Sequence, residues 1–288
     1  MVPLTTPNIL TDTTPVLDEG DPTLARSVIT DAWGLYFAQG GVVMAAALRA
    51  MDAALGRDDL TLASASAAFC RPVACGPVET RVNVLRNGRR GAQVQGSLRD
   101  STAPDDAVSV AVTAVFTDPT MAGPSLTPVP RPFELETVPA PADVEAIDNN
   151  FPLGFLDNTH WHVADSDAAD VREAEVEAIP RLGVWFRFTD PPAAAGRDWN
   201  SALLPIPGDA LGSALVVALG GGDTPVGSVS LQIDLQVLAP IRGSWVGIDS
   251  TCTHIGNGLA SGIAHLWSES GTHVATVTQT AMLRTLGE

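Results

Sequence analysis

The stretch Pro207–Gln236, PGDALGSALVVALGGGDTPVGSVSLQIDLQ, decides the fold of this chain. Leucines recur in it at four-residue intervals, which places them on one face of a predicted helix: Leu211, Leu215 and Leu219. The glycines Gly220–Gly222 are expected to end that helix, because glycine adopts a left-handed closing conformation without steric cost. From Gly227 onward apolar and polar residues alternate, which predicts a long strand. The stretch therefore indicates a helix packed on a sheet, with the acidic Asp209 expected at the start of the helix.

Composition and charge argue against several classes of protein. The 288 residues are 45% hydrophobic, enough for one large domain or two smaller ones. The net charge is −17 and all 16 basic residues are arginines, so phosphate backbones are repelled and we expect no nucleic-acid partner. The longest apolar run, Val42–Leu48, is too short to span a bilayer, so no membrane partner is expected. Three cysteines without a CxxC spacing and an N-terminus without a signal pattern predict a reduced, cytoplasmic protein.

The first half of the chain predicts one helix followed by four strands. The helix is expected over Asp31–Gly56, with Gly40 and Gly41 at its head, where bare backbone can approach another group closely. The predicted strands are Thr61–Val73, Val78–Arg86, Ala92–Arg99 and Val108–Phe116. The Asn-Gly pair in the segment Arg86–Arg90 (RNGRR) predicts a tight hairpin turn.

The second half repeats this order of elements. Its predicted strands are Asn158–Ala164, Ala174–Phe188, Val226–Leu238, Trp245–Cys252, Leu259–Trp267 and Val274–Arg284. The proline-rich span between the halves cannot lie inside a sheet, so it is predicted to be a linker. We therefore divide the chain into a loosely held N-terminal arm, a first unit, a linker and a second unit: residues 1–25, 26–118, 119–147 and 148–288.

The two halves align with an offset of 168 residues, which matches the Arg71-Pro72-Val73 segment to Ala239-Pro240-Ile241. At this offset Asp209 corresponds to Gly41 and Ser230 corresponds to Leu62, and Gln279 corresponds to Thr113 after an allowance of two residues for a loop. A period of this length indicates two copies of one fold unit. Because the set of an acid, a hydroxyl and an amide occurs in one copy, we expect a single working site between the halves.

Three segments resemble those of the TesB-like (type II) acyl-CoA thioesterases. Residues Trp33–Met51 (WGLYFAQGGVVMAAALRAM) resemble the first-helix segment of that family, and Phe69–Leu98 (FCRPVACGPVETRVNVLRNGRRGAQVQGSL) resembles its next three strands. Residues Val274–Arg284 (VATVTQTAMLR) resemble its closing strand. The resemblance covers the chain except for the arm and the linker. It implies an α+β double hotdog fold: two tandem units, each a long helix wrapped by an antiparallel sheet.

The resemblance also implies the chemistry. In that family a water molecule attacks the thioester, held by an Asp at the head of the second helix, a Thr or Ser on the long strand and a Gln on the last strand. These positions fall on Asp209, Ser230 and Gln279 in this sequence. The helix dipole is expected to keep the acid ionised, and free amides at the same helix end are expected to stabilise the oxyanion. No metal and no redox cofactor is implied.

Each of these residues also has a purely structural interpretation. Asp is a preferred helix N-cap residue, so without the resemblance capping is the better explanation of Asp209. Gln279 interrupts an apolar row, where a buried amide needs partners, and hydrogen bonding across the sheet would supply them. Ser230 shares its row with polar residues and has no role if that row faces solvent.

The predicted substrate contacts are Gly40 and Gly41 at the helix head, together with Arg89 and Arg90. These arginines belong to the best local basic cluster for the phosphates of coenzyme A, and the alternative is a solvated hairpin tip. His160 and His162 fall on one face of a strand, but no third ligand follows at a suitable spacing, so no metal site is expected.

The sequence thus predicts an enzyme that hydrolyses a fatty acyl-CoA to a free acid and coenzyme A. One alternative is a non-catalytic double-hotdog protein that binds acyl-CoA or lipid. Another is a dehydratase of the same substrates, although its His–acid pair is not found in a matching motif. Exposed sheet edges favour further association into a homo-oligomer.

Overall fold

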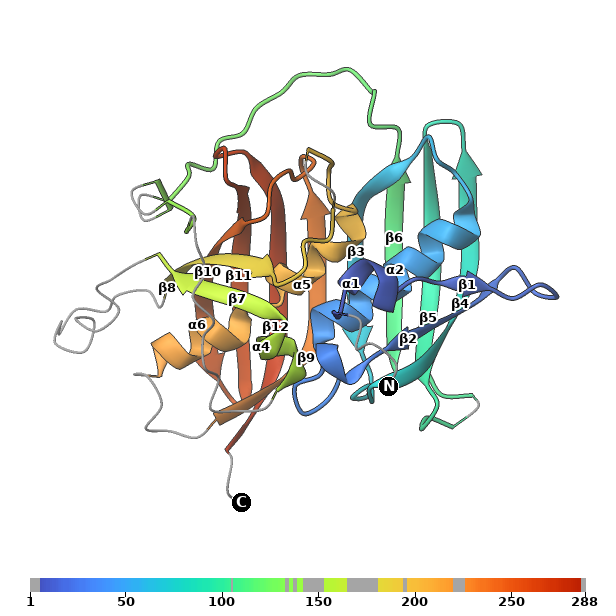
Figure 1. Cartoon of the computed structure of the whole chain (residues 1–288), viewed down its shortest axis with the longest axis horizontal. Helices are drawn as coiled ribbons and strands as arrows, with labels where there is room; N and C mark the ends of the chain where they lie inside the picture. Colours follow the sequence, from blue (N-terminus) through green and yellow to red (C-terminus); the bar gives the residue numbers. More distant parts are fainter. Residues whose placement is uncertain are drawn as a thin grey trace, which may run out of the picture.

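The computed structural model describes residues 6–104, 106–132, 135–136, 139–141, 153–164, 181–193, 196–219 and 226–285. Within them a twelve-stranded sheet forms, in the order β1-β2-β4-β5-β6-β3-β9-β12-β11-β10-β8-β7, and all of its strand pairs are antiparallel. The main helices α2, α5 and α6 pack against this sheet (Figure 1).

The elements of the first unit follow one another without long gaps. They are α1 (Ile9–Asp12), β1 (Val16–Leu17), β2 (Leu24–Ile29), the 3-10 turn η1 (Asp31–Trp33), α2 (Gly40–Leu55), β3 (Thr61–Phe69), β4 (Gly76–Gly88), β5 (Gly91–Asp100) and β6 (Val110–Thr117). The four strands predicted after the first helix are confirmed, with ends that differ by a few residues.

The elements of the second unit occur in the same order. They are α4 (Gly154–Asp157), β7 (Thr159–Val163), β8 (Arg181–Phe188), the 3-10 turn η3 (Ser201–Leu203), α5 (Pro205–Gly208), α6 (Leu211–Ala218), β9 (Val226–Val237), β10 (Val246–Gly256), β11 (Leu259–Ser268) and β12 (His273–Thr285). The part of the predicted strand 174–188 before residue 181, and the predicted helix end at 220–222, lie outside the described residues.

The two units meet in the middle of the sheet, where β3 pairs with β9. Ala65 lies opposite Leu235 and Ala67 opposite Ile233, and the strand order on either side of this pair is mirrored. Both central strands also carry a bulge, at Ala63 in β3 and at Leu231 in β9. These two bulges lie 168 residues apart, which confirms the offset inferred from the sequence.

Helix α2 is the core of the first unit. It is apolar almost all round and nearly every residue from Gly41 to Met51 is buried, as expected for a helix enclosed by a sheet. It ends at Gly56, whose φ of 61° is the predicted left-handed cap. The prediction that this helix starts at Asp31 was wrong: residues 31–33 form a 3-10 turn, a short loop follows, and α2 begins at Gly40.

The second helix is broken, which differs from the single helix expected from Pro207 onward. Helix α5 ends at Gly208 and α6 starts at Leu211, so Asp209 lies in the bend between them. Gly208 packs so closely on β12 that an added Cβ would lie 2.5 Å from Val277. The span Ser201–Ala218 is apolar enough to cross a membrane by composition, with a mean hydropathy of 1.5, but 61% of it is buried inside the protein, as in a core helix.

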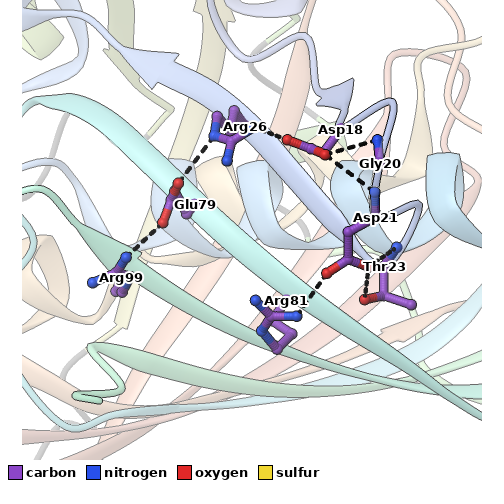
Figure 2. A network of polar contacts seen from close by, with 8 residues as sticks. All are labelled: Asp18, Gly20, Asp21, Thr23, Arg26, Glu79, Arg81 and Arg99. Atoms are coloured by element: carbon purple, nitrogen blue, oxygen red, sulfur yellow. Dashed lines mark hydrogen bonds and ion pairs between the residues drawn. The ribbon is translucent and has the colours of Figure 1, made fainter. Parts of the chain in front are cut away.

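Residues 6–25 are packed onto the first unit, although residues 1–25 were expected to form a loosely held arm. Ile9 is fully buried in the main hydrophobic core and β2 pairs with β4 over its whole length. A chain of ion pairs adds to this contact (Figure 2). Arg26 bridges Asp18 and Glu79, Arg99 donates to the second oxygen of Glu79, and a separate pair forms between Arg81 and Asp21.

Part of the predicted linker covers the outer face of the second unit. The described residues of 119–141 contain no strand, and Leu135 is fully buried in a cluster with Trp185, Trp245 and Trp267. An added Cβ at Gly247 would lie 3.0 Å from Leu135, so this glycine makes room for the linker side chain.

We expect Ile9→Ala to lower the free energy of unfolding by about 3 kcal/mol, because it removes a fully buried side chain and leaves a cavity. Val16→Ala, in the same segment but 66% exposed, serves as the control and should cost little. Denaturant unfolding measures both variants. Equal stability of Ile9→Ala and wild type would show that this segment is loosely held, as expected from the sequence.

Candidate active site

Asp209 reaches out of its own unit and lies at the head of the helix of the other unit. The bend between α5 and α6 directs its carboxylate to the start of α2, where Oδ2 accepts hydrogen bonds from the Gly41 amide (3.0 Å) and from Gln39 Nε2 (2.8 Å). The N-cap of α6 is Ala210, not Asp209. Asp209 directly precedes this N-cap, so it lies at the start of α6 as expected, but its carboxylate does not cap that helix and faces the positive end of α2 instead.

The other carboxylate oxygen faces the strands of the second unit. Asp209 Oδ1 accepts a hydrogen bond from Gln279 Nε2 at 2.5 Å and a longer one from the Ser230 hydroxyl at 3.3 Å. Gln279 Nε2 also donates to Ser230 Oγ at 2.8 Å. The structure thus brings together the three residues predicted from the sequence, in one connected hydrogen-bond network.

The bulge in β9 turns Ser230 toward the interior. Ser230 pairs with buried Ala281, and Leu231 is skipped in the ladder and is exposed, whereas Ile233 and Leu235 are buried. Strict alternation would have placed Ser230 on the outer face with Gln232 and Gln236, both of which are exposed. The extra residue shifts the register by one and brings the hydroxyl to the same side as the carboxylate.

Gln279 occupies the row that the sequence indicated. It is 7% exposed, between the buried Val277 and Ala281 of β12. Its Oε1 accepts from the Leu211 amide (3.3 Å) and its Nε2 donates to Asp209 and Ser230, so both ends of the amide are satisfied. Because each end has a different kind of partner, the orientation of this amide is fixed.

The electrostatics of Asp209 balance burial against hydrogen bonding. Burial raises the pKa of its carboxyl above the ordinary value of 3.8, and the hydrogen bonds from Gln279, Gly41 and Ser230 oppose this shift. The residue lies deep among protein atoms but keeps some solvent access. A carboxylate of this kind, reachable by water and with a raised pKa, is suited to accept a proton.

The two glycines at the head of α2 allow the close approach of the units. A Cβ on Gly40 would lie 2.8 Å from Asp209 Oδ2, and one on Gly41 would lie 2.3 Å from the carbonyl oxygen of Pro205. Gly41 therefore brings α2 and α5 together, and Gly40 leaves room for the carboxylate. The close approach expected at this helix head is present, and the contact of these glycines with substrate stays a prediction.

One residue of this hydrogen-bond cluster was not anticipated from the sequence. Gln39 is the N-cap of α2, and its side chain both accepts from the Val42 amide and donates to Asp209. A polar residue directly before the Gly-Gly pair was the available signal. The amides expected to be free for an oxyanion are engaged at two positions, because Gly41 donates to Asp209 and Leu211 donates to Gln279.

The polar set occurs on one side of the pseudo-symmetry only. Ile233 pairs with Gln279 in the second unit, and its equivalent Ala65 pairs with Ala114 in the first. The equivalent of Gln279 is therefore buried Ala114, and the earlier match to Thr113, which is exposed, was one residue off. The first unit thus offers Gly41, Leu62 and Ala114 at the three places, without a polar side chain.

Arg89 and Arg90 lie far from this cluster. They form the turn between the paired residues Gly88 and Gly91, so the hairpin is present but Asn87 and Gly88 belong to the strand. Arg57, which directly follows the C-cap of α2, donates to the Arg89 carbonyl. The hairpin tip is therefore at the far end of α2, about 24 Å along a 16-residue helix from the Asp209 cluster. The predicted contact of these arginines with the phosphates of coenzyme A stays a prediction.

The histidine pair on β7 is also separate from the cluster. His160 contacts Thr189, and burial lowers the pKa of its imidazole. In the part of the chain that the structure describes, no three His, Cys, Asp or Glu side chains gather in a way that could hold a metal ion.

Comparisons with known proteins identify a family and a fold for this chain. Residues 29–117 match the family model of the acyl-CoA thioesterase N-terminal domain, and residues 132–283 match that of the acyl-CoA thioesterase C-terminal domain. No curated protein matches the chain significantly. The putative thioesterase II of Thermobifida fusca is similar in structure (TM-score 0.72, 23% identity, 99% of each chain covered).

Two further solved structures are similar over their whole length. One is the acyl-CoA thioesterase II TesB2 of Mycobacterium marinum, with a TM-score of 0.70 and 18% identity over 97% of this chain and 98% of that one. The other is a hot dog fold protein of Alicyclobacillus acidocaldarius, with a TM-score of 0.73 and 18% identity over 96% and 98%. These similarities confirm the double hotdog fold.

We expect Gly41→Ala to lower the free energy of unfolding by about 2 kcal/mol or more, since the new methyl group would overlap the backbone of Pro205 and Ile206. Gly123→Ala is the matched control, because an added Cβ there meets nothing within 4 Å. Thermal and denaturant unfolding measure the difference. A fully stable Gly41→Ala variant would show that the two helices do not pack this closely.

Proposed function

Because the chain belongs to the acyl-CoA thioesterase family and is a thioester hydrolase, we propose that it hydrolyses fatty acyl-CoA with a water molecule activated by Asp209. One observation carries the proposal: the Asp209 carboxylate lies between the two units, bonded to Ser230 and Gln279 on one side and to the head of α2 on the other. No second copy of this set exists at the equivalent position of the first unit.

The proposed reaction uses the carboxylate as a general base. A water molecule bonded to Asp209 and Ser230 loses a proton to the carboxylate as its oxygen attacks the thioester carbonyl carbon. Collapse of the tetrahedral intermediate breaks the carbon–sulfur bond, and the coenzyme A thiolate takes the proton. The products are the free acid and coenzyme A, and no redox change occurs. Gln279, with its amide orientation fixed, holds Ser230 and Asp209 in place for this step.

The surface beside the site has apolar side chains that could contact the acyl group of the substrate. The loop that leads into α2 exposes three consecutive large apolar side chains, Leu35, Tyr36 and Phe37, and Tyr36 is 82% exposed. Contiguous apolar groups next to a polar cluster are typical of a surface that contacts an apolar ligand. Association into a homo-oligomer, a cytoplasmic location and the absence of nucleic-acid and membrane partners stay predictions of the sequence.

Asp209→Asn should reduce kcat for acyl-CoA hydrolysis by at least about 100-fold, because an amide cannot take the proton. The matched control is Asp234→Asn. Asp234 lies on β9, the strand that also carries Ser230, and its carboxylate contacts Gln232 and Thr278 on the outer face of the sheet. Thiol release from a panel of acyl-CoAs measures both variants, with circular dichroism to verify folding. Undiminished turnover by Asp209→Asn would show that another group is the general base. Acyl-CoA binding without turnover by wild type would favour the non-catalytic alternative.

The pH dependence of kcat/KM should show an acid limb with a midpoint above 3.8, the ordinary pKa of an aspartic acid. The base works only when ionised, and burial raises the pKa of Asp209, so activity is lost as pH falls through that raised value. Initial rates at limiting substrate between pH 3 and 8 measure the limb. A midpoint at or below 3.8 would contradict this assignment.

A further inference from the structure

Gln39 reaches across the boundary between the units from the N-cap of α2. It is 5% exposed, its Oε1 accepts from the Val42 amide at 2.8 Å and its Nε2 donates to Asp209 Oδ2 at 2.8 Å. Helix N-caps are usually Ser, Thr, Asp or Asn, whose short side chains suffice to accept from the helix. Capping alone does not explain a glutamine here, whereas its longer side chain spans the distance to Asp209.

The two oxygens of Asp209 have different surroundings. Oδ2 accepts from Gln39 and from the Gly41 amide, both at ordinary hydrogen-bond lengths, so its two lone-pair positions are occupied. Oδ1 accepts a short bond from Gln279 and a long one of 3.3 Å from Ser230. The Ser230 contact is the weakest of the four, so this is the place where a water molecule can enter between hydroxyl and carboxylate.

We propose that Gln39 is a positioning residue that fixes Asp209 Oδ2, so that Oδ1 is the oxygen that accepts the proton of the attacking water. This inference rests on the proposed function of the site. Gln39 does not contact the reacting atoms in this assignment; it acts by holding the carboxylate in one rotamer. Its own rotamer is held in turn by the Val42 amide.

Gln39 also contributes to the charge balance of the site. A donor to the ionised carboxylate favours that form, so loss of the Gln39 bond should raise the pKa of Asp209 further. The groups that face Asp209 from α2, β9 and β12 are all neutral: Gln39, Gly40, Gly41, Ser230 and Gln279. Among the described residues, no charged side chain is a main cause of the shifted pKa of Asp209. A change in this pKa after substitution of Gln39 therefore reports the lost hydrogen bond and not a broken ion pair.

The test separates capping from positioning with two variants. Gln39→Asn keeps a preferred N-cap but is one methylene too short to reach Asp209, and Gln39→Ala removes both contacts. For Gln39→Asn we expect an unchanged unfolding midpoint, a kcat at least tenfold lower with KM within twofold, and an acid limb of kcat/KM shifted to higher pH. Gln95→Asn, on the exposed face of β5, is the control and should match wild type. Wild-type kcat and an unmoved acid limb in Gln39→Asn would overturn the proposal, since capping alone would then explain Gln39.

A second measurement does not depend on turnover. NMR titration of isotope-labelled aspartate carboxyl groups, with Asp209 assigned from the signal missing in Asp209→Asn, gives the pKa of this group directly. The expected result is a higher pKa in Gln39→Asn than in wild type, and an equal pKa would overturn the proposal. If wild type hydrolyses no acyl-CoA, the proposed function fails, and this titration still decides whether Gln39 controls Asp209.

Discussion

The hydrogen bonds between Asp209 and the head of α2 connect the two halves of the molecule at the candidate site. An ionised carboxylate away from bulk water is costly unless donors compensate it. Four donors do so here, two from each unit: Gln39 and Gly41 from the first, Ser230 and Gln279 from the second. Neither unit could build this arrangement alone. The packing of α2 against α5 is therefore a requirement of the site as well as of the core.

The asymmetry of the duplicated fold has a physical reason in the same contact. Gly41 and Asp209 occupy equivalent positions, 168 residues apart, and they touch each other across the pseudo-symmetry axis. Acids at both positions would bring two carboxylates side by side, and each would disfavour the ionisation of the other. A side chain at position 41 would also overlap the backbone of α5. Glycine in one copy thus permits a single ionisable acid in the other.

The bulge in β9 shows how a shift of one residue in strand register determines which side chain faces Asp209. Without the extra residue at Leu231, the Ser230 hydroxyl would face away from the helices. The equivalent bulge at Ala63 in β3 indicates that the distortion belongs to the fold unit itself. The same shape therefore positions a serine in one copy and the buried Leu62 in the other, and only the side chains differ.

The sequence by itself determined the local elements and the chemical inventory. Apolar periodicity gave α2 and the central strands, and the one-sided occurrence of Asp209, Ser230 and Gln279 indicated a single site, because these patterns depend only on neighbours along the chain. It did not reveal the tight N-terminal segment, because Ile9 is buried by residues distant in sequence. Strict alternation also placed Ser230 on the wrong row, since a bulge leaves no clear mark in a polar–apolar pattern.

Only the tertiary structure decided which helix receives the carboxylate of Asp209 and that Gln39 joins it. Both depend on a contact between positions 168 and 170 residues apart, created when two similar units pack across a shared sheet. A residue's propensity to cap a helix is local, but the helix that it finally caps is set by packing. For this reason the residues of the site were readable in the sequence, and their partners in the first unit were not.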